Sequence, residues 1–411
     1  MSEPLLSSAE LAATAESIAS VQLANGMIPW FPGGHGDPWN HTEAAVALVV
    51  AGGVAEAEAA YGWLASTQLP DGSWCLYHLA EGIEEPRRDP NVCAYVAAGL
   101  WWHYLETGDE RLLRRMWPVV SGAIEFVLGL QTSGGEVLWN RDVDGHPGSF
   151  ALLTGNSSTY HSLRCAVAIA GHLGFDRPDW ELAAGRVGHA VAHRSGAFEI
   201  KDRWAMDWYY PVFCGAVREE AARDRMEARW DAFVMADLGV RCVVHDPWVT
   251  AAETAECVMA LDAAGLQDQA VTLLDPAPPP TQTAATGPGA PTLSACAFLK
   301  GNGAHIRPRR SSWPTMCLPG GAVRRACSAV NTCRRAWSSR RCPSSAKDDA
   351  AVLNSTRHVR HIVRGTRCLG VGLVERPGPG RRSTRRMTGS GLCGHCHWIA
   401  AGRTSRSRSL R

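Results

Sequence analysis

Apolar and polar residues alternate along residues 1–275 with the spacing of helices, and the pattern separates two kinds of helix. Amphipathic helices with charged faces are predicted near Ser8–Val21, Ala55–Thr67, Glu110–Leu130, Trp180–His193, Glu219–Ala236 and Leu266–Leu274. Between them lie Ala-rich segments that are apolar nearly all round, as buried helices are: Ala44–Ala51, Val92–Trp102, Cys165–Ala170 and Cys257–Ala263. Two concentric layers of helices satisfy this alternation, so the pattern predicts an all-α protein, an (α/α)6 toroid that is incomplete at its C-terminal end.

Signals for helix starts precede the apolar segments. Asp37-Pro38 and Asp89-Pro90 place a capping carboxylate before a proline that fits the first turn of a helix. Asn156-Ser157-Ser158-Thr159 and Asp246-Pro247 are interpreted in the same way. Because the inner helices of a toroid begin at one rim, we expect residues at these starts to converge on one central cavity, a usual place for a ligand.

A repeated motif ends several of the predicted helices. Its three copies are Gln22-x-x-Asn25-Gly26 with Trp30, Gln68-x-x-Asp71-Gly72 with Trp74, and Gln131-x-x-Gly134-Gly135 with Trp139. Asn-Gly, Asp-Gly and Gly-Gly supply the positive φ that a helix C-cap or turn requires. The Gln and Trp of each copy are expected to brace the turn.

Residues 276–411 differ from residues 1–275 in composition. From Pro276 the sequence is rich in Arg, Ser, Pro, Gly and Cys and loses its period. The formal net charge of +1 therefore hides an acidic front and a basic tail. Because a GC-rich gene translated out of frame gives this composition, we predict an α/α-toroid domain in 1–275 and a disordered tail in 276–411 produced by a frameshift.

A genuine basic tail is the alternative to a frameshift, with Arg334-Arg335 and Arg381-Arg382 as phosphate contacts. Nucleic acid is not the expected partner. Cys393-Gly-His-Cys396 lacks the second pair of ligands found in structural zinc sites, so no metal is predicted.

Two features of the sequence bear on location. The residues after Met1 lack a basic stretch followed by an apolar run, and no uninterrupted apolar segment approaches the roughly 18 residues that span a bilayer. The cysteines from Cys75 to Cys257 stand in apolar contexts, which suits reduced core thiols better than disulfides. A cytoplasmic protein without a transmembrane segment is therefore expected.

The stretch from Gln68 to Trp74 resembles the QW-type repeat of squalene cyclases and prenyltransferases. Arg203–Tyr210 and Trp248–Glu253 are also similar to stretches of actinobacterial proteins labelled prenyltransferase. The resemblance implies an α/α toroid that acts on an isoprenoid. The chain lacks the Asp-x-Asp-Asp motif of class II terpene cyclases, and Asp89-Pro-Asn-Val-Cys93 has the wrong spacing for the zinc ligands of protein prenyltransferases. Zinc-dependent transfer to a cysteine is therefore not predicted.

A second resemblance involves Leu100–Asp109 and Met116–Val120, which are similar to glucoamylase-type six-hairpin glycosidases. Those enzymes share the toroid, and their substrates are glycans. The leading hypothesis is a prenyltransferase-like enzyme that uses acid and base carboxylates on an isoprenoid or isoprenoid-linked substrate, without a cofactor. A glycoside hydrolase or lyase that uses the same carboxylates is the first alternative, and a non-catalytic binding protein is the second.

Carboxylates in apolar surroundings are the first candidates for catalysis. Burial of Asp207 beside Trp208 would raise its pKa and keep it protonated as a general acid, although Asp207 would serve equally well as a helix cap. Glu253 lies about one turn inside a buried helix, where a charge is costly unless it is used or paired. The catalytic candidates are Asp207, Glu253 and Glu43, and the substrate-binding candidates are Trp39, His41, Trp74, Asp89, Trp208, Tyr209, Tyr210 and Trp248.

Several of these candidates also have a purely structural interpretation. The aromatic rings would stabilise a carbocation, stack on a sugar, or fill the wall of the toroid. Asp89 is a good helix cap, and a lone histidine such as His41 is more often a hydrogen-bonded structural residue than an acid or base.

Overall fold

The computed structural model describes residues 8–236 and 238–274 of the chain. The chain divides into two units, 1–341 and 342–411, and all described residues belong to the first. The predictions of a basic tail, a frameshift and a Cys-x-x-Cys motif fall outside the described residues.

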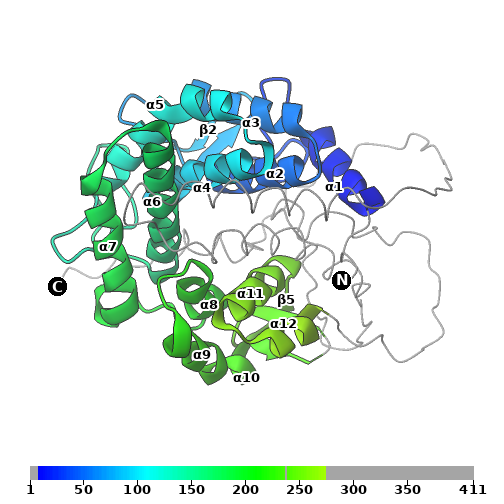
Figure 1. Ribbon diagram of the computed structural model, residues 1–411, viewed down its shortest axis with the longest axis vertical. Helices are drawn as coiled ribbons and strands as arrows, with labels where there is room; N and C mark the ends of the chain where they lie inside the picture. The colour runs from blue at the N-terminus through cyan, green and yellow to red at the C-terminus, as the bar shows by residue number, and fades with distance from the viewer. Residues whose placement is uncertain (1–7, 237, 275–411) are drawn as a thin grey trace, which may run out of the picture. The chain divides into compact units, whose positions relative to one another are not determined.

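Two layers of helices make up the described part of the chain, as the alternation of helix types predicts. The outer helices are α1 (Ser8–Val21), α3 (Val54–Thr67), α5 (Glu110–Leu128), α7 (Pro178–His193), α9 (Glu219–Ala228) and α12 (Gln267–Leu274). The inner helices are α2 (Pro38–Val50), α4 (Pro90–Thr107), α6 (Leu153–Leu173), α8 (Ala205–Phe213) and α11 (Ala251–Ala264). Successive inner helices pack against each other, and Figure 1 shows them inside the outer layer. The prediction of an all-α toroid is confirmed.

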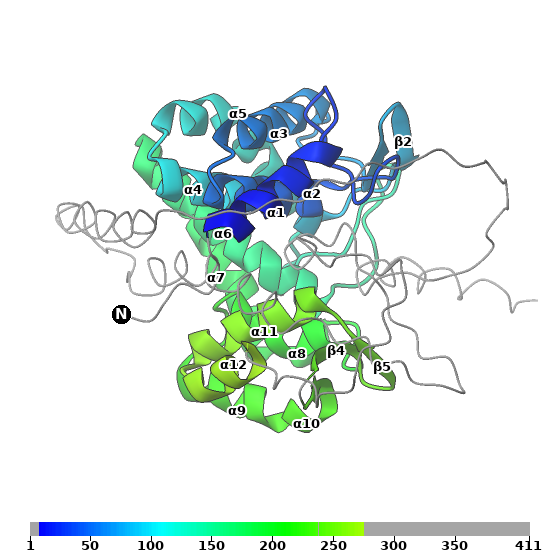
Figure 2. The ribbon, with the colours of Figure 1, turned by 90° about the vertical axis from the view of Figure 1, so that its right-hand side faces the viewer.

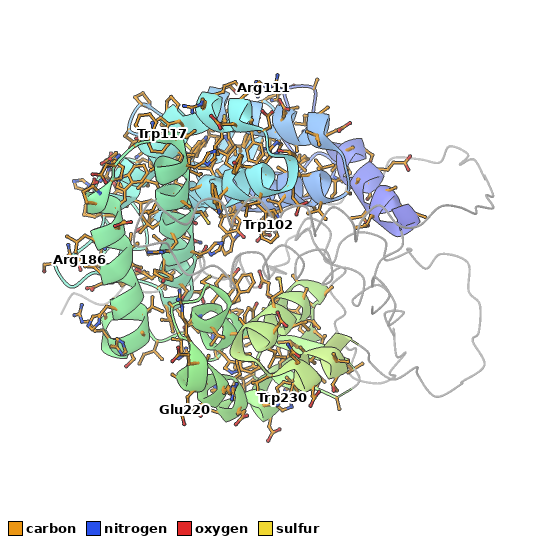
Figure 3. The ribbon with its side chains drawn as sticks, in the orientation of Figure 1. Trp102, Arg111, Trp117, Arg186, Glu220 and Trp230 are labelled. Carbon is orange, nitrogen blue, oxygen red and sulfur yellow. The ribbon has the colours of Figure 1, made fainter. Side chains whose placement is uncertain are left out.

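The two layers differ in burial as their sequences require. In outer helix α5 the buried residues form a stripe that includes Leu112, Met116 and Val120, spaced four residues apart. Inner helix α11 is buried on nearly all sides from Glu253 to Leu261. Figure 3 shows Trp102 of α4 pointing toward the middle of the ring, whereas Arg111 lies on its outer side.

Short strands occur in the connections, where the sequence pattern predicts none. Strands β1 (Tyr77–Leu79) and β2 (Gly82–Glu85) form an antiparallel hairpin before α4. Strands β3 (Val234–Met235), β4 (Gly239–Val243) and β5 (Asp246–Val249) form a small antiparallel sheet before α11. Figure 2 shows β2, β4 and β5 on the same side of the ring. The connections that enter α4 and α11 therefore lie at one rim.

The predicted helix starts are right at two positions and wrong at two others. Asp37 and Asp89 cap α2 and α4 by accepting backbone N–H groups of the first turn. Asp246-Pro247 belongs to β5 instead, and Thr250 caps α11 with its hydroxyl oxygen. The cluster that begins at Asn156 lies inside α6, which starts at Leu153.

The helix predicted over Glu219–Ala236 is also interrupted. It divides into α9, the short α10 (Trp230–Phe233) and β3.

The three copies of the repeated motif form docking loops, which we define as residues 22–26, 68–72 and 131–135. In the second loop, Gln68 Nε2 donates to the carbonyl of Gly72 (2.9 Å) and to that of Val119 in α5 (2.8 Å). The other two loops repeat this geometry. Gln22 Nε2 donates to the backbone carbonyls of Gly26 and of Glu56 in α3. Gln131 Nε2 donates to those of Gly135 and of Ala183 in α7. Each docking loop thus ties its own turn to the next outer helix along the chain.

Glycine allows each docking loop to approach the neighbouring helix backbone. Gly72 has φ +84°, and a Cβ there would lie 2.0 Å from the carbonyl oxygen of Gly122 in α5. The same contact joins Gly26 to Ala59 and Gly135 to Arg186, where a Cβ would lie 2.2 and 2.7 Å from the carbonyl oxygen. Any side chain would meet backbone at all three positions, so the motif requires glycine for both its φ and its lack of Cβ.

Two further expectations concern the cysteines and the membrane. The cysteines of the described residues are free and buried, in agreement with core thiols: Cys75, Cys93, Cys165, Cys214, Cys242 and Cys257. Among the helices of residues 8–274, none has the length and apolar character needed to span a bilayer.

Candidate active site

Asp207 is a buried carboxylate in the first turn of α8. Trp204 occupies the N-cap position of this helix and no side chain caps it, so the capping role considered for Asp207 is not the one it has. Its Oδ1 instead accepts a hydrogen bond from the hydroxyl of Thr154, in the first turn of α6, at 2.7 Å. Burial raises the pKa of Asp207 to about 6, against the opposing effects of the Thr154 hydrogen bonds and of Arg225 and Lys201.

Glu253 occupies the equivalent place in the next inner helix. It lies in the first turn of α11, its side chain is 0% exposed, and its backbone N–H donates to the Thr250 hydroxyl oxygen. Because α8 and α11 pack against each other, Asp207 and Glu253 stand at corresponding ends of two adjacent helices. Glu253 is also close enough to Tyr209 to contribute to the raised pKa of that phenol, after burial and Glu256.

A third carboxylate, Glu256, lies one turn further along α11 and is absent from the sequence-based candidates. It is buried and accepts hydrogen bonds from the hydroxyls of Tyr209 and Tyr210, the latter at 2.9 Å. Residues three apart share a helix face, so Glu253 and Glu256 point to the same side of α11. The signal that selects Glu253, a charge in an Ala-rich apolar helix, applies equally to Glu256 and could have found it.

Aromatic contacts connect the tyrosines that bind Glu256 to residues of helices α2 and α4. The ring of Trp39, in α2, lies 6.2 Å from that of Tyr210 and 5.5 Å from that of Tyr95 in α4, centroid to centroid. Trp39 Nε1 also donates to Glu43 Oε1 at 2.8 Å. Four inner helices thus contribute to one central cluster, which we define as Trp39, Glu43, Tyr95, Tyr209, Tyr210 and Glu256.

Other candidates have structural roles. His41 Nδ1 accepts a hydrogen bond from the backbone N–H of Ile28, and Nε2 donates one to the carbonyl of Ala60. Both ring nitrogens are therefore hydrogen-bonded to the backbone. Burial lowers the pKa of His41 to about 4 and keeps the ring neutral. Asp89 caps α4, and burial raises its pKa to about 6.

The other candidate tryptophans are not members of the central cluster, although the ring of Trp208 lies 6.3 Å from that of Tyr209, centroid to centroid. Trp74 is fully buried in the hydrophobic core between the helices, and its Nε1 donates to the carbonyl of Leu64. Trp208 stacks on Phe233 and donates to the carbonyl of Arg225, on the outer side of α8. Trp248 is buried within β5.

Solved structures similar to this chain have the same toroid. An uncharacterized conserved protein from Thermus thermophilus matches with a TM-score of 0.53 at 13% identity, over 65% of this chain and 90% of that protein. The GH63 mannosylglycerate hydrolase of the same organism gives 0.51 at 13% identity over the same shares. A further glycosidase gives 0.52 at 15% identity, over 65% of this chain and 82% of that one. At these identities the likeness shows the fold alone.

Sequence similarity identifies the family to which this chain belongs. No model of a known protein family matches the sequence. A protein of Mycolicibacterium hassiacum, the MMP endo-(1,4)-3-O-methyl-alpha-D-mannosidase, is 53% identical over 252 residues, which cover 61% of this chain and 70% of that enzyme. This chain belongs to the family of that mannosidase and is a glycoside hydrolase by descent.

The leading hypothesis from the sequence is therefore wrong. A prenyltransferase or terpene cyclase acts on isoprenoids, whereas the relative that is 53% identical is a mannosidase. The resemblance to six-hairpin glycosidases was the correct one. The misleading signal, the Gln68–Trp74 motif, contains one of the docking loops, which ties a turn to α5. A motif that serves the fold does not specify the chemistry.

Proposed function

We propose that this protein is an endo-acting glycoside hydrolase that cleaves internal 1,4-linkages between 3-O-methyl-α-D-mannose units. The observation that carries this proposal is the 53% identity, over 252 residues, to an enzyme with that activity in its name. The buried carboxylates and aromatic rings contributed by the inner helices support it.

Asp207 is the proposed general acid. Glycoside hydrolysis requires one carboxylic acid that protonates the leaving oxygen and one carboxylate that activates water or attacks the anomeric carbon. Burial raises the pKa of Asp207 to about 6, so this side chain retains its proton at a pH where an ordinary aspartate has lost it. The Asp207 proton passes to the glycosidic oxygen as the bond from that oxygen to the anomeric carbon breaks.

Glu253 is the proposed second carboxylate. It stands in the first turn of α11, next to α8, and shares a helix face with Glu256. Its buried position in an Ala-rich helix strengthens its interaction with the positive charge that develops on the sugar ring. Glu43, the third catalytic candidate from the sequence, is held by Trp39 and is assigned to positioning.

The central cluster is the proposed contact surface for the sugar. Trp39, Tyr95 and Tyr210 combine apolar ring faces with polar edges, which suits a sugar whose 3-hydroxyl carries an apolar methyl group. Glu256, fixed by two tyrosine hydroxyls, would accept hydrogen bonds from sugar hydroxyls.

Product analysis of purified full-length protein tests the proposal. A 1,4-linked oligosaccharide of 3-O-methyl-α-mannose is the substrate, and mass spectrometry follows its length; an endo enzyme yields fragments of several units before any monosaccharide accumulates. Asp207→Asn and Glu253→Gln are each expected to lower kcat by at least about a hundredfold. Glu181→Gln, an exposed change on outer helix α7, is the control and should retain activity. A folded wild-type protein that leaves the oligosaccharide intact would refute the proposal.

A further inference from the structure

Three side chains from three helices converge at a place that the proposed chemistry does not use. Glu58 of α3, His103 of α4 and Asp109 at the start of α5 each offer one ligand atom, and these atoms lie within 4.8 Å of one another. His103 lies in the C-terminal half of α4, whereas Asp207 and Glu253 lie in the first turns of their inner helices. The convergence is therefore separate from the candidate carboxylates.

His103 is the buried member of the group. Its side chain is 1% exposed, and neither ring nitrogen has a hydrogen-bond partner in the part of the chain that the structure describes. Buried polar atoms without partners are rare and costly, so an imidazole with two of them, beside two carboxylates, is suited to bind a cation.

Two arginines contact the carboxylates, and both are free to move away. Arg115 Nη2 lies 3.3 Å from Glu58 Oε2, and Arg111 Nε lies 3.2 Å from Asp109 Oδ1. The arginine side chains are 61% and 91% exposed, and exposed ion pairs of this kind contribute little to stability. Figure 3 shows Arg111 on the outer side of the ring. A cation could therefore replace both guanidinium groups at small cost.

We propose that Glu58, His103 and Asp109 bind a divalent transition-metal ion, with Zn²⁺ as the ion that this set suits. One imidazole nitrogen and two carboxylate oxygens are donors that zinc accepts, and water would complete a tetrahedral site. The ion joins α3 to α4 and α5, so its role is to stabilise the packing of consecutive helices. The site does not depend on the function proposed above.

A second group with the same ligand types serves as a built-in control. Asp142, Asp144 and His146 also bring their ligand atoms within 4.8 Å, but in an exposed loop where Asp142 accepts bonds from the loop's own N–H groups. This group lacks a buried side chain without a partner, and no site is proposed there.

Zinc titration of the full-length protein tests the proposal. After dialysis against EDTA, wild type, Glu58→Gln, Asp109→Asn and His146→Gln are titrated with ZnCl₂ by calorimetry, and their Tm is measured with and without zinc. Asn caps helices as well as Asp does, so Asp109→Asn removes the anionic ligand while α5 keeps its N-cap. Glu58 is partly exposed, so Glu58→Gln leaves the fold intact.

Wild type and His146→Gln are expected to bind one more zinc ion than Glu58→Gln and Asp109→Asn, or to bind it at least about tenfold more tightly. Zinc should raise the Tm of the first two proteins only. Every variant contains the same cysteines in residues 276–411, so the difference between variants isolates this site. Equal stoichiometry and affinity in all four proteins would overturn the proposal and leave an ion-pair cluster. Hydrolytic activity enters neither outcome.

Discussion

The close approach of Gly72 to α5 makes a sharp prediction about stability. Gly72→Ala places a methyl group where a Cβ lies 2.0 Å from the carbonyl oxygen and 2.3 Å from the carbonyl carbon of Gly122. Both are backbone atoms of a helix, so they cannot turn away as a side chain would. Gly52 is the matched control because it has a similar φ of +90° with nothing within 4 Å of its Cβ position.

The difference between the two variants isolates the clash. Both place alanine in the left-handed region, at a cost of roughly 1–2 kcal/mol. Gly72→Ala adds an overpacking cost of roughly 1–3 kcal/mol. For a domain of this size 1 kcal/mol corresponds to roughly 2–4 °C, so Gly52→Ala should lower Tm by roughly 2–8 °C and Gly72→Ala by a further 2–12 °C or so. The gain from a less flexible unfolded chain is the same in both and cancels.

Thermal unfolding followed by circular dichroism, with urea unfolding as a second probe, measures both variants against wild type. Matching m-values would show that the variants change the free energy of unfolding and leave the unfolded ensemble unchanged. If Gly72→Ala and Gly52→Ala lose the same stability, the contact between the docking loop and α5 does not have the closeness described above. The reasoning for all three docking loops would then be refuted.

Three further predictions concern buried polar groups. Burial raises the pKa of Asp207 to about 6, so the contribution of this side chain to stability is present at low pH and is lost as pH rises through 6. Asp207→Asn should therefore be more stable than wild type at pH 8, by up to about 3 kcal/mol, and should lose activity. If Asp207 is the general acid, the kcat/KM of the wild-type enzyme should fall above about pH 6. Because burial lowers the pKa of His41 from 6.5 to about 4, the stability of the wild type should fall by up to about 3 kcal/mol as pH falls from 6.5 to 4. The stability of His41→Gln, measured by urea unfolding, should depend less on pH over this range. Tyr209→Phe with Tyr210→Phe removes two donors from Glu256 and should cost about 1–3 kcal/mol per lost bond by urea unfolding; an unchanged midpoint would contradict the network.

The helical layers could be predicted from the sequence because their signal is local. Burial of a whole helix or of one face leaves a period that needs no knowledge of the partner, as in α5 and α11. The strands before α11 could not, because Asp246-Pro247 carries the same local signal as the true cap Asp37-Pro38. Asp246-Pro247 belongs to a strand because β5 pairs with β4 in an antiparallel hairpin, with Val243 opposite Asp246, and the Asp-Pro signal says nothing of that pairing.

The candidate site was predictable in part. A carboxylate within an apolar helix is conspicuous, which is how Asp207 and Glu253 were found. The roles of His41 and Trp74 depend on carbonyl groups elsewhere in the chain, Ala60 and Leu64, and no residue pattern announces such partners. The prediction of the substrate class was wrong for a chemical reason, because the same aromatic faces suit a carbocation and a sugar. The comparison with a mannosidase separated these two substrate classes.

The docking loops have a consequence for biosynthesis. Each glutamine bonds a carbonyl that lies later in the chain, 34, 51 and 52 residues after Gln22, Gln68 and Gln131. During translation, the hydrogen bond between each loop and its helix therefore cannot form until that helix has been synthesised and has left the ribosome. We expect the ring to assemble from the N-terminus one hairpin at a time, so that translation itself sets the order of folding and spares the chain a search among similar hairpins for the right neighbour.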